Sequence, residues 1–246
     1  YDGSGFHGYA RQPGIRTVQG DLEAALFHST GEIATFVAGR TDKGVHATDQ
    51  VVSFTSDELD TDRVQRSLNR QLAPSIAVHR IVEVGDDFHA RFSATGRAYR
   101  YRIRNTDVHD PFRAATSWTY PHPLDVAVMN EAMQVLVGEH DFAAFCRKAG
   151  DAPTTRRLEW AVWRRSDDLV ELSIGASSFC HQMVRSIVAV SVEIGRGRLG
   201  PEAMGDILGG RDRAAAKGAA PPHGLTLVAV AYGEALPRPG WVPDTP

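Results

Sequence analysis

The sequence predicts an α+β protein made of two halves that share one order of elements. Apolar residues recur with strand or helix spacing in the order strand, helix, strand, strand, helix, strand, first in residues 1–95 and again in residues 96–236. That order, found twice, is the ferredoxin-like arrangement in duplicate. A length of 246 residues suits one large domain or two small ones. We therefore expect an N-terminal half at 1–95, a C-terminal half at 96–236 and a tail at 237–246.

The elements of the first half follow from apolar spacing and from the Gly, Pro and Asp residues between them. They are the end of a strand at 6–9, a helix at 17–29, strands at 32–37 and 51–55, a helix at 61–72 and a strand at 75–84. A loop at 39–47 lies between the two middle strands. The chain opens at Tyr1 inside a motif and without methionine, so we expect residues upstream to be missing and the first strand to be truncated.

The second half repeats the order. It comprises a strand at 96–104, a helix at 124–137, strands at 157–164 and 169–175, helices at 178–195 and 201–208, and a strand at 225–232. The Pro- and His-rich link at 108–123 is the natural boundary region. The Pro-rich tail after Leu236 is expected to be frayed.

Composition excludes several classes of protein. With 42% hydrophobic and 23% charged residues, the chain is neither disordered nor collagen-like. Its two cysteines, Cys146 and Cys180, provide neither a disulfide framework nor a CxxC metal site, which is typical of a cytosolic protein. The longest apolar stretch, at 187–194, falls far short of the roughly 20 residues that a membrane span needs. No signal peptide is visible.

The charge balance does not identify a partner by itself. There are 27 Lys+Arg against 30 Asp+Glu, a net charge of −3, which argues mildly against nucleic acid. The positive charge, however, is 24 Arg against 3 Lys, and Arg suits phosphates and base stacking. A GC-rich genome produces the same bias, so the positions of the arginines must decide.

The loop at 39–47 contains the most unusual acidic residue. Asp42 lies between Arg40 and Lys43 in a turn bracketed by Gly39 and Gly44. Neighbouring cations favour the ionised carboxylate, which could act as a nucleophile or an electrostatic stabiliser. Alternatively, Asp42 caps a tight turn beside solvated cations. Residue types alone favour this second role, because Asp and Gly are usual turn residues.

Arginines follow several predicted elements. In the strand at 97–104, the period of two places Arg100, Arg102 and Arg104 on one face and Tyr99, Tyr101 and Ile103 on the other. This pattern suits RNA, but equally a half-buried strand with a solvated Arg face. A second stripe, on the helix at 61–72, comprises Arg63, Arg66 and Arg70. A third group comprises Arg147, Lys148, Arg156 and Arg157. Together they indicate a basic surface on an acidic molecule.

Arg185 lies in a helix that is apolar nearly all round. A charge in such a place costs several kcal/mol unless it is paired, so Arg185 should meet a carboxylate or phosphate. That partner is either any core acid or Asp42.

Several kinds of site have no sequence support. HExxH and zinc-type Cys/His spacings are absent, and so are GxGxxG and P-loop motifs. His46, His89 and His140 are interpreted as structural. Protease and thiol chemistry have no signature, and neither a metal nor a cofactor is expected.

Taken together, the motifs resemble those of the TruA family of tRNA pseudouridine synthases nearly from end to end. The stretches that carry this resemblance are YDGSGFHG at 1–8, TVQG at 17–20 with Glu23, AGRTDKGVHA at 38–47, FHARFSA at 88–94, RAYRY at 97–101, GEHDF at 138–142 with Phe145, MVR at 183–185, GLTL at 224–227 and VAY at 230–232. Each is weak alone, whereas their shared order and spacing are specific. The loop at 38–47 is the most diagnostic.

The resemblance implies a pseudouridine synthase fold with a central antiparallel sheet and a cleft between the halves. It implies Asp42 as the catalytic aspartate, Tyr99 as the residue packing on the target uracil, Arg40 as a nucleotide-flipping arginine and Arg185 beside the catalytic acid. The resemblance further implies a homodimer that acts in the anticodon arm of tRNA at positions 38 to 40. With this resemblance, the interpretation of Asp42 as a turn cap becomes the weaker one. The interpretation of Arg185 as the partner of any core acid becomes the weaker one too.

The chain departs from the family pattern at three places. Lys43 replaces a commonly small residue, Cys180 replaces the leucine of Phe-Leu-His, and LAPSI at 72–76 replaces Leu-Pro-Pro-Asp-Ile. None of these departures changes Asp42, Tyr99, Arg40 or Arg185. Two other hypotheses stay open, a non-catalytic RNA-binding module and a hydrolase that uses Asp42 on a small substrate. The intact loop argues against the first, and the Arg-rich surface argues against the second.

Overall fold

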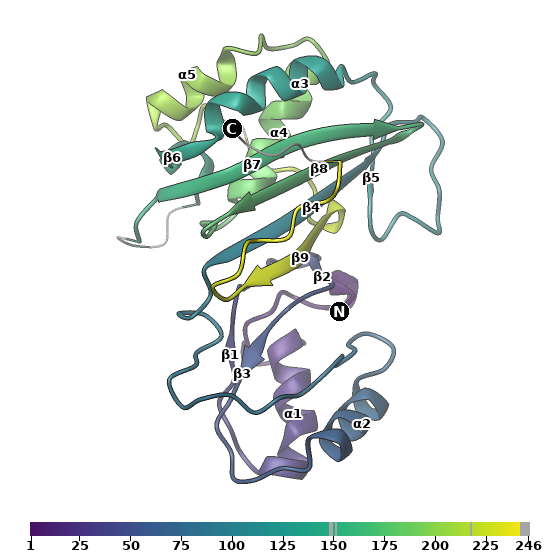
Figure 1. Ribbon diagram of the computed structural model, residues 1–246. Coiled ribbons are helices and arrows are strands. Elements are labelled where there is room, and N and C mark those ends of the chain that lie inside the picture. Colours follow the sequence, from purple (N-terminus) through teal and green to yellow (C-terminus); the bar gives the residue numbers. More distant parts are fainter. Residues whose placement is uncertain (148–149, 151, 217, 242–246) are drawn as a thin grey trace. The chain divides into compact units, whose positions relative to one another are not determined.

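A computed structural model describes residues 1–147, 150, 152–216 and 218–241 (Figure 1). The chain forms two compact units, Tyr1–Ala94 (unit 1) and Thr95–Pro246 (unit 2). Unit 1 holds two helices and short strands, and unit 2 is built on a large sheet. The molecule is thus mixed α and β, as the sequence predicts.

Unit 1 is organised around two amphipathic helices. Its elements are a 3-10 turn η1 (Gly3–Gly5), α1 (Val18–Thr30), β1 (Phe36–Val37), β2 (His46–Ala47), β3 (Val52–Ser53) and α2 (Thr61–Leu72). Thr17 caps α1 by accepting from the Gly20 N–H, and Asp60 caps α2 by accepting from the Arg63 N–H. Both helices bury their apolar sides in one core, and β1 pairs antiparallel with β3.

Two strands predicted in unit 1 are wrong. Residues 75–84 are extended but unpaired with any strand, although Ile76 is buried in the helix core. Side chains of α2 replace a neighbouring strand here. Asn69 accepts from the Val78 N–H at 2.7 Å and donates to the Val78 carbonyl at 2.9 Å, and Gln65 donates to the same carbonyl. Residues 6–9 form a bend with Gly8 at φ +97°, not the end of a strand.

Unit 2 follows the order strand, helix, strand, strand, helix, strand, with additions. Its elements are β4 (Gly96–Arg104), β5 (Trp118–Thr119), α3 (Val126–Met133), η2 (Gln134–Leu136), β6 (Gly138–Asp141), η3 (Ala143–Phe145), β7 (Thr155–Ser166), β8 (Leu169–Ala176), α4 (Met183–Gly195), α5 (Ala203–Gly210), η4 (Pro222–Gly224) and β9 (Leu225–Ala231). The strands lie in the order β9-β4-β8-β7-β6, all antiparallel, and β5 pairs parallel to β4.

The two faces of this sheet are covered differently (Figure 1). Helices α3, α4 and α5 lie on one face, where Asn130 of α3 exchanges two hydrogen bonds with the backbone of Trp163 in β7. The C-terminal segment crosses the other face. There Leu236 packs near Trp160, and the guanidinium of Arg238 lies 4.8 Å from the ring centroid of Trp160.

This arrangement corrects two expectations in unit 2. The tail is not frayed up to residue 241, because Trp241 packs against the Trp160 cluster and lies under Arg164. Residues 242–246 lie outside the described residues. Helix α4 starts later than the predicted helix at 178–195, since residues 178–182 are not helical and Gln182 is left-handed at φ +65°.

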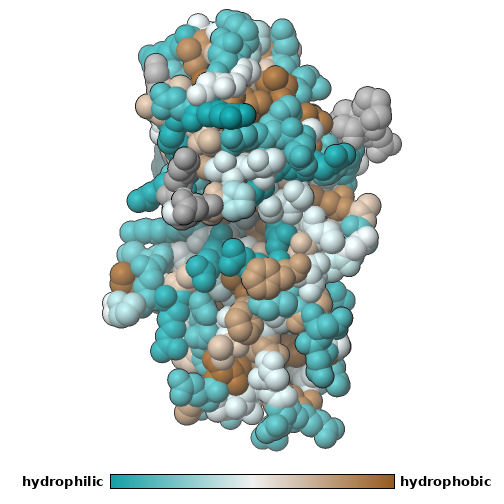
Figure 2. Space-filling model, turned by 90° about the vertical axis from the view of Figure 1, so that its left-hand side faces the viewer, coloured by the Kyte–Doolittle hydropathy of each residue, from teal (hydrophilic) through white to brown (hydrophobic). Residues whose placement is uncertain are grey.

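Hydrophilic residues predominate on the face shown in Figure 2, with hydrophobic residues in small groups between them. Among the residues that the structure describes, none of the helices has the length and hydropathy required to cross a membrane.

Candidate active site

Asp42 lies at the first position of a tight turn in unit 1. The Val45 N–H donates to the Asp42 carbonyl oxygen at 3.1 Å, and Gly44, at the third position, has φ +79°. A residue with positive φ at this position is the requirement of a type II turn, which explains the glycine. Asp42 is half-buried, while Lys43 is exposed. The turn therefore fixes the backbone from which the carboxylate projects.

The opening motif of the chain is the platform for this turn. The Gly3 N–H donates to Nδ1 of buried His46 at 3.0 Å, and the Tyr9 N–H donates to the Thr41 carbonyl at 3.0 Å. A methyl group on Gly3 would overlap the carbonyl of Val45, and one on Gly8 would lie 3.0 Å from the Thr41 oxygen. Only glycine allows such a close approach of two backbones.

The other end of the loop is held by a side chain. Gln50 donates to the Gly39 carbonyl at 2.7 Å and accepts from the Gly39 N–H at 3.3 Å, so its amide replaces a strand partner. Arg40, the next residue, is exposed and makes no ion pair or side-chain hydrogen bond within the residues described. The loop thus holds the backbone of Asp42 at a fixed place beside an exposed cation.

Tyr99 lies in β4 of unit 2, opposite Ile174 of β8 and Leu227 of β9. The register with β9 shifts between Ala98 and Tyr99. Tyr99 is buried, and the ring of Phe179 packs against it edge to face, with centroids 5.1 Å apart. The sequence alone did not predict a role for Phe179, which stands in a motif beside Cys180.

Arg185 projects from α4 toward the segment that precedes β9. Its Nε donates to the Ala220 carbonyl at 2.7 Å, and its own carbonyl accepts from the Ala220 N–H at 2.9 Å. The Tyr101 hydroxyl donates to the Pro221 carbonyl at 2.8 Å. Burial raises the pKa of Tyr101, and nearby Arg185 opposes this rise. Tyr101 and Arg185 therefore hold one segment between them.

The predicted residues thus fall into two groups, with Arg40 and Asp42 in unit 1 and Tyr99 and Arg185 in unit 2. A family model described as tRNA pseudouridine synthase matches residues 1–93 and 132–233. The chain belongs to this family. The matched stretches include Arg40, Asp42 and Arg185, whereas Tyr99 lies between them.

Curated relatives agree with this assignment over most of their length. The chain is 43% identical to tRNA pseudouridine synthase A of Frankia casuarinae over 94% of this chain and 86% of the relative. It is 44% identical to the protein of that name from Halalkalibacterium halodurans, over 92% and 87% of the two chains. With the Thermotoga maritima protein the identity is 38%, over 94% and 96%. Enzymes of the tRNA pseudouridine synthase family are isomerases.

The arginine face of β4 is largely neutralised in this synthase family member. Glu171 of β8 lies 3.0 Å from Arg102 and 3.6 Å from Arg100, and Asp168 pairs with Arg104 at 2.6 Å. Tyr101 and Ile103 on the opposite face are buried. The strand is therefore half-buried, with an Arg face that is ion-paired rather than simply solvated.

The residues of the remaining predicted basic group differ in their surroundings. Arg157 pairs with Glu159 at 3.2 Å, and Arg156 donates to the Thr155 carbonyl. Arg147 is exposed, and Lys148 lies outside the described residues.

A disulfide between Cys146 and Cys180 was not foreseen. Its Cα atoms are 5.6 Å apart, and it joins the loop after η3 to the segment before α4. The Arg147 N–H also donates to the His181 carbonyl at 2.9 Å. The bond thus fixes the segment that carries Phe179. The only sequence signal was the presence of two cysteines, because a separation of 34 residues does not predict a pair.

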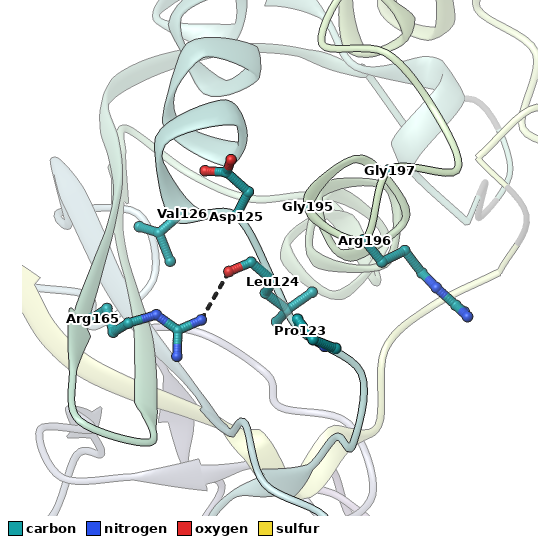
Figure 3. Close-up of a pocket in the computed structure, with 8 residues that line it drawn as sticks. All are labelled: Pro123, Leu124, Asp125, Val126, Arg165, Gly195, Arg196 and Gly197. Carbon is teal, nitrogen blue, oxygen red and sulfur yellow. Dashed lines mark hydrogen bonds between the residues drawn. The ribbon is translucent and has the colours of Figure 1, made fainter.

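A hollow in unit 2 contains none of the predicted site residues (Figure 3). It measures about 640 Å³ and is lined by Pro123, Leu124, Asp125, Val126, Arg165, Gly195, Arg196 and Gly197. The guanidinium of Arg165 is hydrogen-bonded within it, since Nη2 donates to the Leu124 carbonyl at 2.8 Å (Figure 3). The same nitrogen donates to Oδ1 of Asn105 at 2.9 Å. Among the residues described, no cluster of His, Cys, Asp or Glu could hold a metal ion.

Proposed function

We propose that this protein isomerises uridine to pseudouridine in the anticodon stem-loop of tRNA, at positions 38 to 40, with Asp42 as the nucleophile. The observation that supports this most directly is the turn at 42–45, which is built onto the opening motif through Gly3 and Gly8 in a chain of the tRNA pseudouridine synthase family. A fixed backbone holds a carboxylate at one place, as nucleophilic catalysis requires.

The reaction needs little beyond positioning and one nucleophile. The N1–C1′ bond breaks, the uracil turns, a C5–C1′ bond forms, C5 loses its proton and N1 gains one. No electrons are exchanged, so the proposal requires no redox cofactor. The carboxylate of Asp42 attacks either C1′ of the ribose or C6 of the ring. Either route gives a covalent intermediate that resolves to the isomer.

Three further residues have proposed roles. The target nucleotide lies in a stacked stem or loop and must be flipped out, at a cost of a few kcal/mol. Arg40, exposed and without an ion pair among the residues described, would fill the vacated space. Tyr99 would hold the uracil face and assist removal of the C5 proton. Arg185, placed in α4 by its bonds to Ala220, would pair with the catalytic carboxylate.

We further propose that the two units are ferredoxin-like halves of a homodimeric cytoplasmic enzyme, each of which supplies active-site residues. The order β9-β4-β8-β7, with α3 and α4 on one face, supports the ferredoxin-like assignment of unit 2. In unit 1, the helix pair and the β1–β3 ladder support it, with an extended segment at 75–84 in place of a strand. The proposed cytoplasmic location follows from the proposed tRNA substrate.

Release of tritium from [5-³H]uridine-labelled tRNA tests the proposal, because C5 loses its hydrogen only if the new bond forms there. We expect wild type to release tritium and Asp42→Asn to be slower by at least about 10³-fold, since the amide cannot act as the nucleophile. Asp57→Asn is the matched control, because Asp57 is an exposed loop carboxylate away from the turn.

The outcomes separate the alternatives. Binding of tRNA without tritium release by wild type would indicate a non-catalytic RNA-binding module. Release that survives in Asp42→Asn would assign the nucleophile to another residue. Loss of release in Asp57→Asn as well would show that the effect is not specific to the turn.

A further inference from the structure

A basic groove lies along α2 in unit 1, apart from the turn that holds Asp42. It has a volume of about 390 Å³ and is lined by His28, Arg63, Arg66, Ser67, Arg70 and Gln71. Five of these residues belong to α2, and His28 belongs to the last turn of α1. We call these six residues the α2 groove.

The arginines of the α2 groove differ from those of β4 in their partners. Arg63, Arg66 and Arg70 are exposed, and none of them makes an ion pair or a side-chain hydrogen bond within the residues described. On β4, by contrast, Glu171 and Asp168 neutralise the arginines. The three arginines of the α2 groove therefore form a group of positive charges without ion-pair partners among the residues described, on a protein whose net charge is −3.

The groove is held by rigid elements. Gln71 donates to Ser67 at 3.1 Å and to the Ala25 carbonyl of α1 at 3.4 Å, so its amide bridges the two helices along the floor. Val64 and Leu68 are buried on the opposite side of α2 and fix its rotation. The guanidinium groups are thus presented on one side of a packed helix.

The spacing of the arginines matches a chain of phosphates. Arg63 and Arg70 are seven residues apart, which is roughly 10 Å along a helix with a rise of 1.5 Å per residue. A nucleic-acid strand carries one phosphate per about 3.4 Å of helix axis, so the stripe extends over about three phosphate-to-phosphate steps. The lining has no Phe, Tyr or Trp, the rings that form stacking platforms in single-strand binding proteins, and His28 supplies its one ring. The geometry thus suits the backbone of a nucleic acid rather than its bases.

We propose that the α2 groove binds successive phosphates of the RNA substrate, at a place other than the nucleotide that reacts. This inference rests on the proposed function, because it takes tRNA as the partner. Guanidinium groups donate to phosphate oxygens in a fork, and such contacts position an RNA without reading its sequence. The groove would therefore add affinity and register but take no part in bond making.

The test uses the full chain and an unmodified tRNA transcript. The variant Arg63→Gln, Arg66→Gln, Arg70→Gln removes three positive charges from the α2 groove. A matched control, Arg80→Gln, Arg113→Gln, Arg211→Gln, removes three from exposed positions elsewhere. A third variant carries Lys at 63, 66 and 70 and keeps the charge. Circular dichroism checks that all three fold like wild type.

We expect the groove variant to bind the transcript at least about tenfold more weakly than the control variant does. The slope of log affinity against log salt should fall by about 2, since each lost phosphate contact removes roughly 0.7–0.9 from it. In the tritium assay KM should rise while kcat at saturating tRNA stays unchanged. The Lys variant should keep the salt slope of wild type, because it retains the charges.

Equal affinities and salt slopes for the groove and control variants would overturn the inference while leaving the proposed enzyme intact. Equal losses in both would also overturn it, because net charge alone would then explain the effect. A fall in kcat with unchanged KM would place the groove in the chemistry instead of in phosphate binding. Since binding is measured independently of turnover, a wild type that binds but releases no tritium would contradict only the proposed function.

Discussion

Gly3 shows how the absence of a side chain determines the position of the predicted nucleophile. Its N–H donates to His46, and its Cα approaches the Val45 backbone so closely that a methyl group would overlap the carbonyl. Val45 closes the turn that begins at Asp42. The position of the proposed nucleophile therefore depends on a residue 39 positions away in the sequence, which carries no reactive group.

Replacement of Gly3 by alanine should displace this turn. We expect Gly3→Ala to lose about 1–3 kcal/mol of unfolding free energy by overpacking, and to lose tritium release because Asp42 shifts. Urea unfolding and the tritium assay measure the two effects. Gly5→Ala is the control in the same 3-10 turn, since its methyl group would meet only the flexible end of Arg16 at 3.4 Å. Equal behaviour of the two variants would contradict this account of the turn.

Individual elements differ in how far the sequence predicts them. The bounds of α2 at 61–72 and β4 at 96–104 are as predicted, because each has a clear period, and Asp60 caps the helix. At 75–84 the same alternating pattern misleads, because the backbone bonds that a strand would make are made by Gln65 and Asn69. Apolar spacing reports which side chains are buried, not which backbone groups pair.

Two of the predicted site residues could be singled out from the sequence for a similar reason. Asp42 and Arg185 stood out because a charge in each place needs an explanation from nearby residues. Phe179 and Cys180 did not, since their roles depend on partners far along the chain, Tyr99 and Cys146. Contacts between distant segments leave no local signal in one sequence.

The disulfide should contribute measurably to the stability of unit 2. Closing a loop of 34 residues removes entropy from the unfolded chain worth roughly 3–4 kcal/mol. We expect dithiothreitol to lower the urea midpoint of wild type and to leave Cys146→Ser, Cys180→Ser unaffected. Thiol titration of the unfolded protein, prepared without reductant, should find no free thiol. Two titratable thiols there would contradict the bond.

At the scale of the whole molecule, net charge is a poor guide to the partner. The sum of −3 combines arginines that face Glu171 and Asp168 with those of the α2 groove, which face no carboxylate within the residues described. RNA binding depends on where the cations lack ion-pair partners. A sequence gives the total, and only the fold gives the pairing.

Buried tyrosines should limit stability in alkali. Burial raises the pKa of Tyr101 and of Tyr9 above the usual value of 10. The folded protein therefore keeps protons that the unfolded chain releases near pH 10, and stability is full below that pH and falls as the pH rises above it. We expect urea midpoints to drop between about pH 9 and pH 11, and less steeply in Tyr101→Phe. An unchanged midpoint across this window would contradict the burial effect.

The C-terminal segment crosses the face of the sheet opposite α3, α4 and α5, and this arrangement has a practical consequence. Two of the four tryptophans, Trp160 and Trp241, lie where this segment meets the sheet, each within 6 Å of a guanidinium, that of Arg238 or Arg164. Indole emission is sensitive to such neighbours. The molecule thus contains its own optical reporter, whose colour and intensity follow the docking of the segment without any added label.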